Sequence, residues 1–201
     1  MGRSATCDGL PMTGIDIPTH LSGQLLIAMP GLADPNFSGT VTLICEHTDA
    51  GAMGLVINHP TNVTLEEIFD QMDVEGSLVQ RQQMVLSGGP VNLERGFILH
   101  RTGDGNWESS LRINDELTLT ASPDIVRALA SEEAPNPALM LLGYAGWGPG
   151  QLEEEIQQNS WLTTPATARL VLDTPVTERL PMAVAAAGVN FGRLSGGAGR
   201  A

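Results

Sequence analysis

The chain has 201 residues, of which 42% are hydrophobic, and no apolar run reaches the roughly 18 residues that a membrane-spanning helix requires. Its 23 acidic residues outnumber ten basic ones, all of which are arginine, so the formal net charge is −13. The lack of lysine excludes a P-loop, a pyridoxal phosphate Schiff base and Ser-x-x-Lys hydrolase chemistry, and the acidic balance disfavours generic nucleic-acid binding.

The two ends of the chain differ in composition from its middle. Residues 1–19 are predicted to form a flexible extension, because they are small and polar and lack the apolar core of a signal peptide. Residues 20–192 are expected to form a single domain, followed by a disordered glycine-rich tail at 193–201. One cysteine, Cys7, lies in the extension and the other, Cys45, in an apolar run, so a disulfide framework is not expected. We therefore expect a cytoplasmic protein.

Several strand-like runs precede the first helix. Apolar residues between turn clusters predict strands at 24–29, 40–47 and 53–58, with the last two forming a hairpin. A helix is predicted to follow Thr64, which is its N-cap, and Glu67 completes a capping box ahead of apolar residues at helical spacing.

The remainder of the chain continues this mixture of strands and single helices. Further strands are predicted at 84–86, 96–101, 110–113, 117–120, 138–144 and 168–173. Helices are predicted to begin at Ser122 and near Gln151, and an alanine-rich helix is predicted to end before Gly188. Runs of strands without strict βαβ alternation predict an α+β fold with a mainly antiparallel sheet.

Cys45 and His47 are the first candidates for chemistry. Residues i and i+2 of a strand share a face, so the two side chains are predicted to meet on one side of the sheet. A buried cysteine beside a hydrogen-bonded histidine and an activated thiolate for redox or nucleophilic work are both compatible with this arrangement. His20, His59 and His100 come from unconnected segments and give no metal-ligand spacing, so no metal or other cofactor is expected.

Two glycine-rich segments are candidates for ligand-binding loops. The stretch 87–90 (SGGP) follows a strand and is either a tight turn that needs glycine or a nest of backbone amides for an anion. The loop 145–150 (AGWGPG) precedes a helix, but the acidic residues 153–155 in the first turn would repel a phosphate. We therefore expect a structural loop there.

Two basic side chains, Arg95 and His100, bracket a strand. They are either solvated strand ends or, if they converge with Ser87 and Asn58, part of a small polar pocket. The residues of the candidate ligand pocket are Cys45, His47, Asn58, Ser87, Gly88, Gly89, Arg95 and His100.

Three long motifs occur in succession: LLIAMPGLADPNFSGTVTLICEHTDAGAMGLVIN, LSGGPV…RGFILH and LLGYAGWGPGQLEEEIQQNSWL. They resemble the signatures of the YqgE/AlgH family of bacterial proteins, from about residue 23 to residue 190. The resemblance implies a single-domain fold in which a bifurcated, mainly antiparallel sheet curls into a pseudo-barrel flanked by helices. One branch of that family is labelled as a transcriptional regulator of alginate synthesis, and His59 stands at a position that varies in the family.

These observations favour a non-enzymatic regulatory or adaptor protein that acts through a protein partner or a small ligand. An enzyme or redox sensor that uses Cys45 with His47 is the alternative. Direct DNA binding ranks third, because the predicted helices are separated by strands and so do not form a helix-turn-helix.

Overall fold

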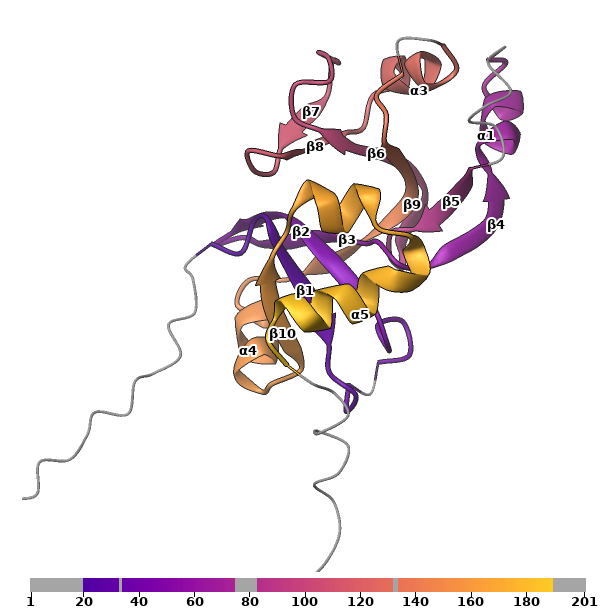
Figure 1. The fold of residues 1–201 in the computed structure, drawn as a ribbon. Helices are drawn as coiled ribbons and strands as arrows, with labels where there is room; N and C mark the ends of the chain where they lie inside the picture. Colours follow the sequence, from indigo (N-terminus) through magenta and orange to yellow (C-terminus); the bar gives the residue numbers. More distant parts are fainter. Residues whose placement is uncertain (1–19, 33, 75–82, 132–133, 190–201) are drawn as a thin grey trace, which may run out of the picture.

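A ten-stranded, mainly antiparallel sheet forms the centre of the protein (Figure 1). The computed structural model describes residues 20–32, 34–74, 83–131 and 134–189. The strands are β1 (Gln24–Ala28), β2 (Val41–Thr48), β3 (Gly51–Val56), β4 (Pro60–Thr64), β5 (Met84–Ser87), β6 (Val91–Arg101), β7 (Ser110–Arg112), β8 (Leu117–Thr120), β9 (Ala138–Trp147) and β10 (Trp161–Pro165). The helices are α1 (Leu65–Gln71), α3 (Pro123–Leu129), α4 (Gln151–Gln157) and α5 (Val176–Ala186), with a π-helical turn η1 (Arg169–Asp173).

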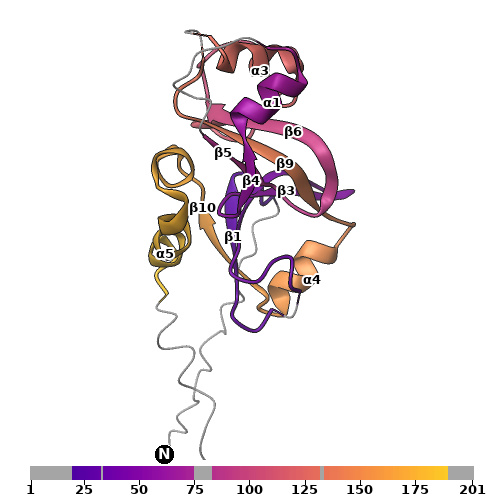
Figure 2. The same ribbon diagram turned by 90° about the vertical axis from the view of Figure 1, so that its right-hand side faces the viewer.

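The sheet divides at β9. The strand order is β10-β1-β2-β3-β9-β6-β8-β7, and β5 pairs with β9 in parallel while β4 pairs with β5. The C-terminal end of β9 pairs with β3, and its N-terminal part pairs with β6 and β5. The sheet curls into a half-barrel with helices on several sides, so the α+β class and the bifurcated antiparallel sheet are confirmed (Figure 2).

Three apolar cores join the helices to the sheet. The largest lies between the sheet and the pair η1 and α5, which cover β1 and β2 in Figure 1. A second lies beneath α1 and α3, and a third lies beneath α4 and contains the indoles of Trp147 and Trp161. None of the helices within the described ranges is long and apolar enough to span a membrane.

Most of the predicted elements are present. The hairpin of β2 and β3 and the capping box at Thr64 and Glu67 are confirmed. The strand predicted at 168–173 is wrong, because this segment is the π-helical turn η1 with three consecutive buried residues. A short buried apolar run has the same appearance in a strand and in a helical turn. Strands β4 and β10 were not predicted, and β9 extends through Trp147 into the predicted glycine loop.

A buried arginine fastens α5 to the sheet. Arg179 is 2% exposed, donates from Nε to the carbonyl oxygen of Thr174 at 3.0 Å and from Nη1 to that of Ile57. Burial lowers the pKa of this guanidinium to about 10, so it remains charged at neutral pH. Its two carbonyl partners join α5 to the end of η1 and to the residue after β3.

Candidate functional site

Cys45 and His47 lie on opposite faces of β2, so the predicted shared face is wrong. The register passes from Ile44↔Gly54 to Glu46↔Met53, which leaves Cys45 as the extra residue of a β-bulge. Cys45 therefore packs in the core under α5, and its thiol donates to the carbonyl oxygen of Leu43 at 3.7 Å. His47 instead pairs across the strands with Ala52, which packs against the core beneath α4.

The Cys45 thiol is held in its protonated form. It is 2% exposed, and burial, followed by the neighbouring carboxylate of Glu46, raises the pKa of the thiol far above its ordinary value. Because the thiolate is the nucleophile, this environment opposes the redox or nucleophilic use of Cys45.

We expect Cys45 to label slowly in the folded protein. In a Cys7→Ser background, an aromatic disulfide reagent should modify Cys45 at neutral pH much faster after unfolding in urea than before it. Cys45→Ala should lower the free energy of unfolding by roughly 1–2 kcal/mol, because it truncates a buried side chain. Rapid labelling of the folded protein, lost in His47→Ala, would contradict this account of Cys45.

Both ring nitrogens of His47 are engaged. The backbone N–H of Leu21 donates to Nδ1 at 3.0 Å, and Nε2 lies 2.8 Å from Oε1 of Glu153 on α4. Since Nδ1 accepts, the ring proton lies on Nε2 and is donated to the Glu153 carboxylate. His20 contacts the same ring edge-on, with 6.5 Å between centroids. The histidine thus joins the segment before β1 to α4, with neither nitrogen free to act as a base.

A second carboxylate of α4 binds two tryptophans. Oε2 of Glu155 accepts hydrogen bonds from Nε1 of Trp147 at 3.0 Å and from Nε1 of Trp161 at 2.8 Å. The side chain of Gln151 accepts from the backbone N–H of Gly148 at 3.0 Å at the start of the helix. The loop before α4 is therefore joined to the helix by a side chain of the helix itself. Sequence reasoning missed the partners of Glu153 and Glu155, because they come from distant strands.

The SGGP segment is a three-strand junction. The amide of Ser87 donates to the carbonyl oxygen of His59 at 2.8 Å, and the amide of Gly88 donates to that of Leu142 at 2.7 Å. These two N–H groups are therefore not directed at a bound anion, and the anion-nest interpretation fails for them. A side chain on Gly88 or Gly89 would meet the backbone of β9, so glycine is required here for close approach as well as for the positive φ of Gly89.

The remaining predicted pocket residues do not converge. Asn58 accepts from the amide of Val41 at 2.8 Å and donates to the carbonyl oxygen of Gly39 at 2.9 Å. The Arg95 guanidinium stacks 5.2 Å above the centre of the Phe97 ring.

His100 is buried elsewhere. Its Nδ1 bonds to the carbonyl oxygen of Arg101 at 2.8 Å and its Nε2 to the hydroxyl of Thr120 at 2.9 Å. Burial lowers its pKa. Each of these polar side chains therefore has a structural partner, and the eight predicted residues are distributed over separate parts of the fold.

Two of the eight residues, Ser87 and Gly89, line a common cavity of about 400 Å³, here called the β5–β6 cavity. Its lining consists of Pro35, Asn36, Val56, His59, Ser87, Gly89, Pro90 and Leu93. His59 was not among the predicted pocket residues, because its position varies in the family that the sequence resembles. Within the described ranges, no group of three or more His, Cys, Asp or Glu side chains is placed to hold a metal ion.

Comparison with known proteins identifies the family. The model of the AlgH-like family, DUF179, matches residues 25–192. The chain belongs to this family. It is 50% identical over 181 residues to a UPF0301 protein of Saccharophagus degradans, covering 90% of this chain and 89% of the relative. It is 44% identical over 191 residues to a UPF0301 protein of Nitrosospira multiformis, covering 94% and 100%.

Solved structures agree with this assignment. The solution structure of the AlgH protein from Pseudomonas aeruginosa matches with a TM-score of 0.75 and 41% identity, covering 100% of both chains. The crystal structure of a protein from Corynebacterium diphtheriae matches with a TM-score of 0.64 and 22% identity, covering 81% of this chain and 90% of that one. The second likeness concerns the fold alone. The family resemblance read from the three motifs is confirmed.

Proposed function

We propose that this AlgH-like protein is a non-enzymatic regulatory or adaptor protein of the cytoplasm that acts through a protein partner or a small ligand. The observation that carries the proposal is that Cys45, His47 and His100 form their contacts inside the fold. Both ring nitrogens of His47 and of His100 have partners inside the fold, and the Cys45 thiol is buried and faces away from His47. Residues arranged in this way stabilise a scaffold, whose activity then resides on its surface.

Native mass spectrometry of the protein purified from its own host at natural abundance tests the proposal. A regulatory or adaptor protein should retain a second polypeptide or a small molecule at a fixed ratio. Cys45→Ala and His47→Gln, where they fold, should keep that association because neither side chain reaches the surface. Loss of the associated mass in both folded variants, or a bare protein that turns over a substrate, would instead favour the enzyme or redox alternative.

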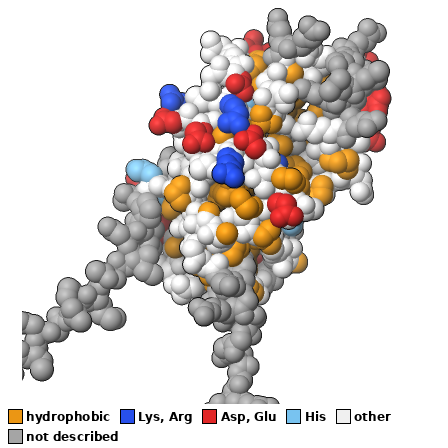
Figure 3. Space-filling view, viewed as in Figure 1, with side chains coloured by type: hydrophobic (Ala, Val, Ile, Leu, Met, Phe, Trp, Pro, Cys, Tyr) orange, Lys and Arg blue, Asp and Glu red, His pale blue; other side chains and the backbone are white. Residues whose placement is uncertain are grey.

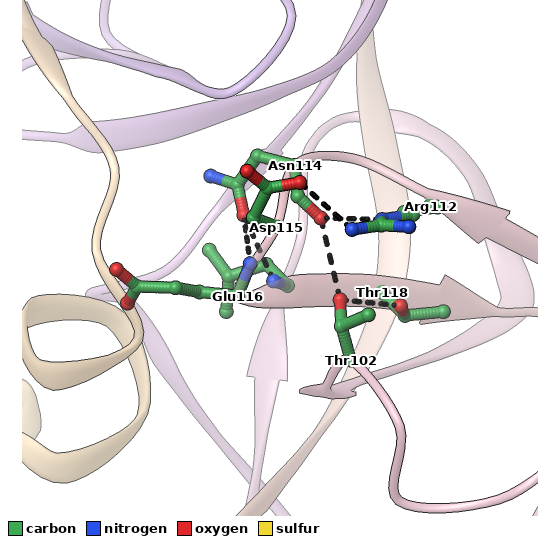
Figure 4. Close-up of polar contacts among 7 residues, drawn as sticks. Thr102, Arg112, Asn114, Asp115, Glu116 and Thr118 are labelled. Carbon is green, nitrogen blue, oxygen red and sulfur yellow. Dashed lines mark hydrogen bonds and ion pairs between the residues drawn. The ribbon is translucent and has the colours of Figure 1, made fainter.

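Two arginines within the described ranges are paired with carboxylates, which opposes their use in binding DNA. On the face shown in Figure 3, basic side chains stand beside acidic ones. Arg101 pairs with Asp173 at 2.7 Å and Arg112 with Asp115 at 2.7 Å, and Figure 4 shows the second pair at the turn between β7 and β8. A phosphate would have to compete with these carboxylates.

We expect no appreciable binding to random-sequence duplex DNA at physiological salt, because the net charge is −13 and phosphate binding requires unpaired cations. Fluorescence anisotropy with a labelled duplex checks this expectation. Micromolar binding that weakens steeply with added salt would contradict this expectation and would favour direct nucleic-acid binding.

A further inference from the structure

The N-terminal half of β6 contains a wide bulge beside the β5–β6 cavity. Its register with β9 passes from Val91↔Tyr144 to Gly96↔Leu142, so four residues of β6 face a single residue of β9. All four, Asn92 to Arg95, are exposed, and Asn92 adopts a φ of 51°. Backbone N–H and C=O groups outside a ladder can pair with another chain.

Apolar side chains are exposed along this bulge. Leu93 is 60% exposed and lines the cavity, and Val91 is 39% exposed two residues earlier. Burial of this exposed apolar area by a partner would be favourable. Val91 is not among the lining residues, so a ligand confined to the cavity would leave it exposed, whereas an extended peptide over the bulge could cover both side chains.

The cavity is preformed. Two backbone hydrogen bonds hold three of its lining residues in place: the amide of Val56 donates to the carbonyl oxygen of Gly88 at 2.8 Å, and the amide of Ser87 donates to that of His59 at 2.8 Å. The connection between β1 and β2 contributes Pro35 and Asn36 to the lining of the cavity. Asn58, which follows β3, holds this connection in place through its hydrogen bonds to Gly39 and Val41. A site that is already ordered loses less conformational entropy when it binds.

The lining favours an uncharged occupant. Pro35, Val56, Pro90 and Leu93 supply apolar walls, and no carboxylate or guanidinium is among the lining residues. The His59 ring and the Ser87 hydroxyl can exchange hydrogen bonds with a peptide group. The cavity volume of about 400 Å³ lies within the range of roughly 300–1,000 Å³ typical of ligand pockets.

We propose that the β5–β6 cavity and the adjacent β6 bulge bind an uncharged apolar segment of a partner polypeptide in extended conformation. One aliphatic side chain of that segment enters the cavity beside Leu93, and its backbone pairs with the exposed stretch Asn92 to Arg95. Main-chain hydrogen bonds and a side-chain pocket are the two parts of strand-addition recognition. This inference rests on the proposed function and names the kind of partner through which it operates.

Methyl NMR with capped tripeptides tests the site. Acetyl-Ala-Leu-Ala-methylamide should shift the methyl resonances of Val56 and Leu93 saturably, with a dissociation constant on the order of 1 mM. Acetyl-Ala-Asp-Ala-methylamide should bind at least about tenfold more weakly. Isobutanol, which has a similar branched chain but no peptide groups, should cause smaller shifts that do not saturate in the same range.

Three variants complete the test. Leu93→Glu places a charge at the cavity mouth and His59→Trp fills the cavity, so both should abolish the leucine-peptide shifts of Val56. Leu111→Glu is the matched control, because Leu111 is 37% exposed on β7 and should leave binding unchanged. The proposal is overturned if the leucine peptide causes no shift, if Leu93→Glu binds it as well as the parent protein, or if isobutanol or the aspartate peptide binds equally well.

The failure of this site can be told apart from failure of the regulatory function. If the tripeptide does not bind, but Leu93→Glu purified from the host still retains an associated mass, only the location and chemistry of the site are wrong. If the parent protein retains no associated mass, the regulatory or adaptor function itself fails.

Discussion

Replacing Glu155 by alanine should lower the free energy of unfolding by about 2–5 kcal/mol and shift the tryptophan emission. The Glu155 carboxylate is the acceptor for the indole N–H groups of Trp147 and Trp161, which are 6% and 3% exposed. Without it, two buried donors lose their partner, and each unsatisfied donor costs about 1–3 kcal/mol. Urea unfolding followed by fluorescence measures both effects, because two of the three tryptophans in the chain are affected directly.

The neighbouring residue provides the control. Glu154→Ala makes the same chemical change on the same helix, but Glu154 is exposed. Its free energy of unfolding should change by no more than about 0.5 kcal/mol, as for ordinary surface substitutions. If both variants lose the same stability, helix charge and propensity account for the loss, and the indole bonds contribute nothing measurable.

This contrast shows what the sequence can predict and what it cannot. The capping box at Thr64 and Glu67 was predicted because both partners lie within one helical turn. The residues 153–155 are three identical side chains in the sequence, and local reasoning gives them one common role at the helix start. In the structure, Glu153 binds His47, whereas Glu155 accepts hydrogen bonds from the two indoles. These different roles depend on partners that lie on strands outside the helix.

The predicted shared face of Cys45 and His47 was wrong for a related reason. The pairing of Cys45 with His47 assumed regular alternation along β2, and a single bulge residue moved the histidine to the other face. A bulge is fixed by the partner strand, so the residues of β2 alone do not reveal it. Conversely, the glycine-rich segment that contains Ser87 and Gly89 is a local signal for a possible ligand site. The structure places both residues at a cavity that is completed by residues distant in the chain, among them Pro35 and Asn36.

Replacing Gly89 by alanine should lower the free energy of unfolding by about 3 kcal/mol or more, through steric conflict added to backbone strain. Gly89 has a φ of 150°, which L-residues rarely adopt, and a Cβ atom there would meet the backbone of Tyr144 and Ala145 in β9. Backbone atoms of a central strand cannot rotate away as a side chain can. The junction of β3, β5 and β9 would therefore have to open, and the β5–β6 cavity would change shape with it.

Alanine substitutions at two other glycines, measured by urea unfolding, separate the steric contribution from the backbone strain. Gly39→Ala introduces only strain, because Gly39 has a φ of 70° but nothing lies within 4 Å of its added Cβ, and it should cost about 1 kcal/mol. Gly31→Ala introduces neither effect and should be close to neutral. If Gly89→Ala and Gly39→Ala lower the free energy of unfolding equally, β9 must shift to accommodate the new methyl group at little cost. The expected order is a loss at Gly89 well above that at Gly39, and a loss at Gly39 above that at Gly31. It would show that the SGGP segment, two of whose residues line the proposed peptide site, needs glycine for its close contact with β9.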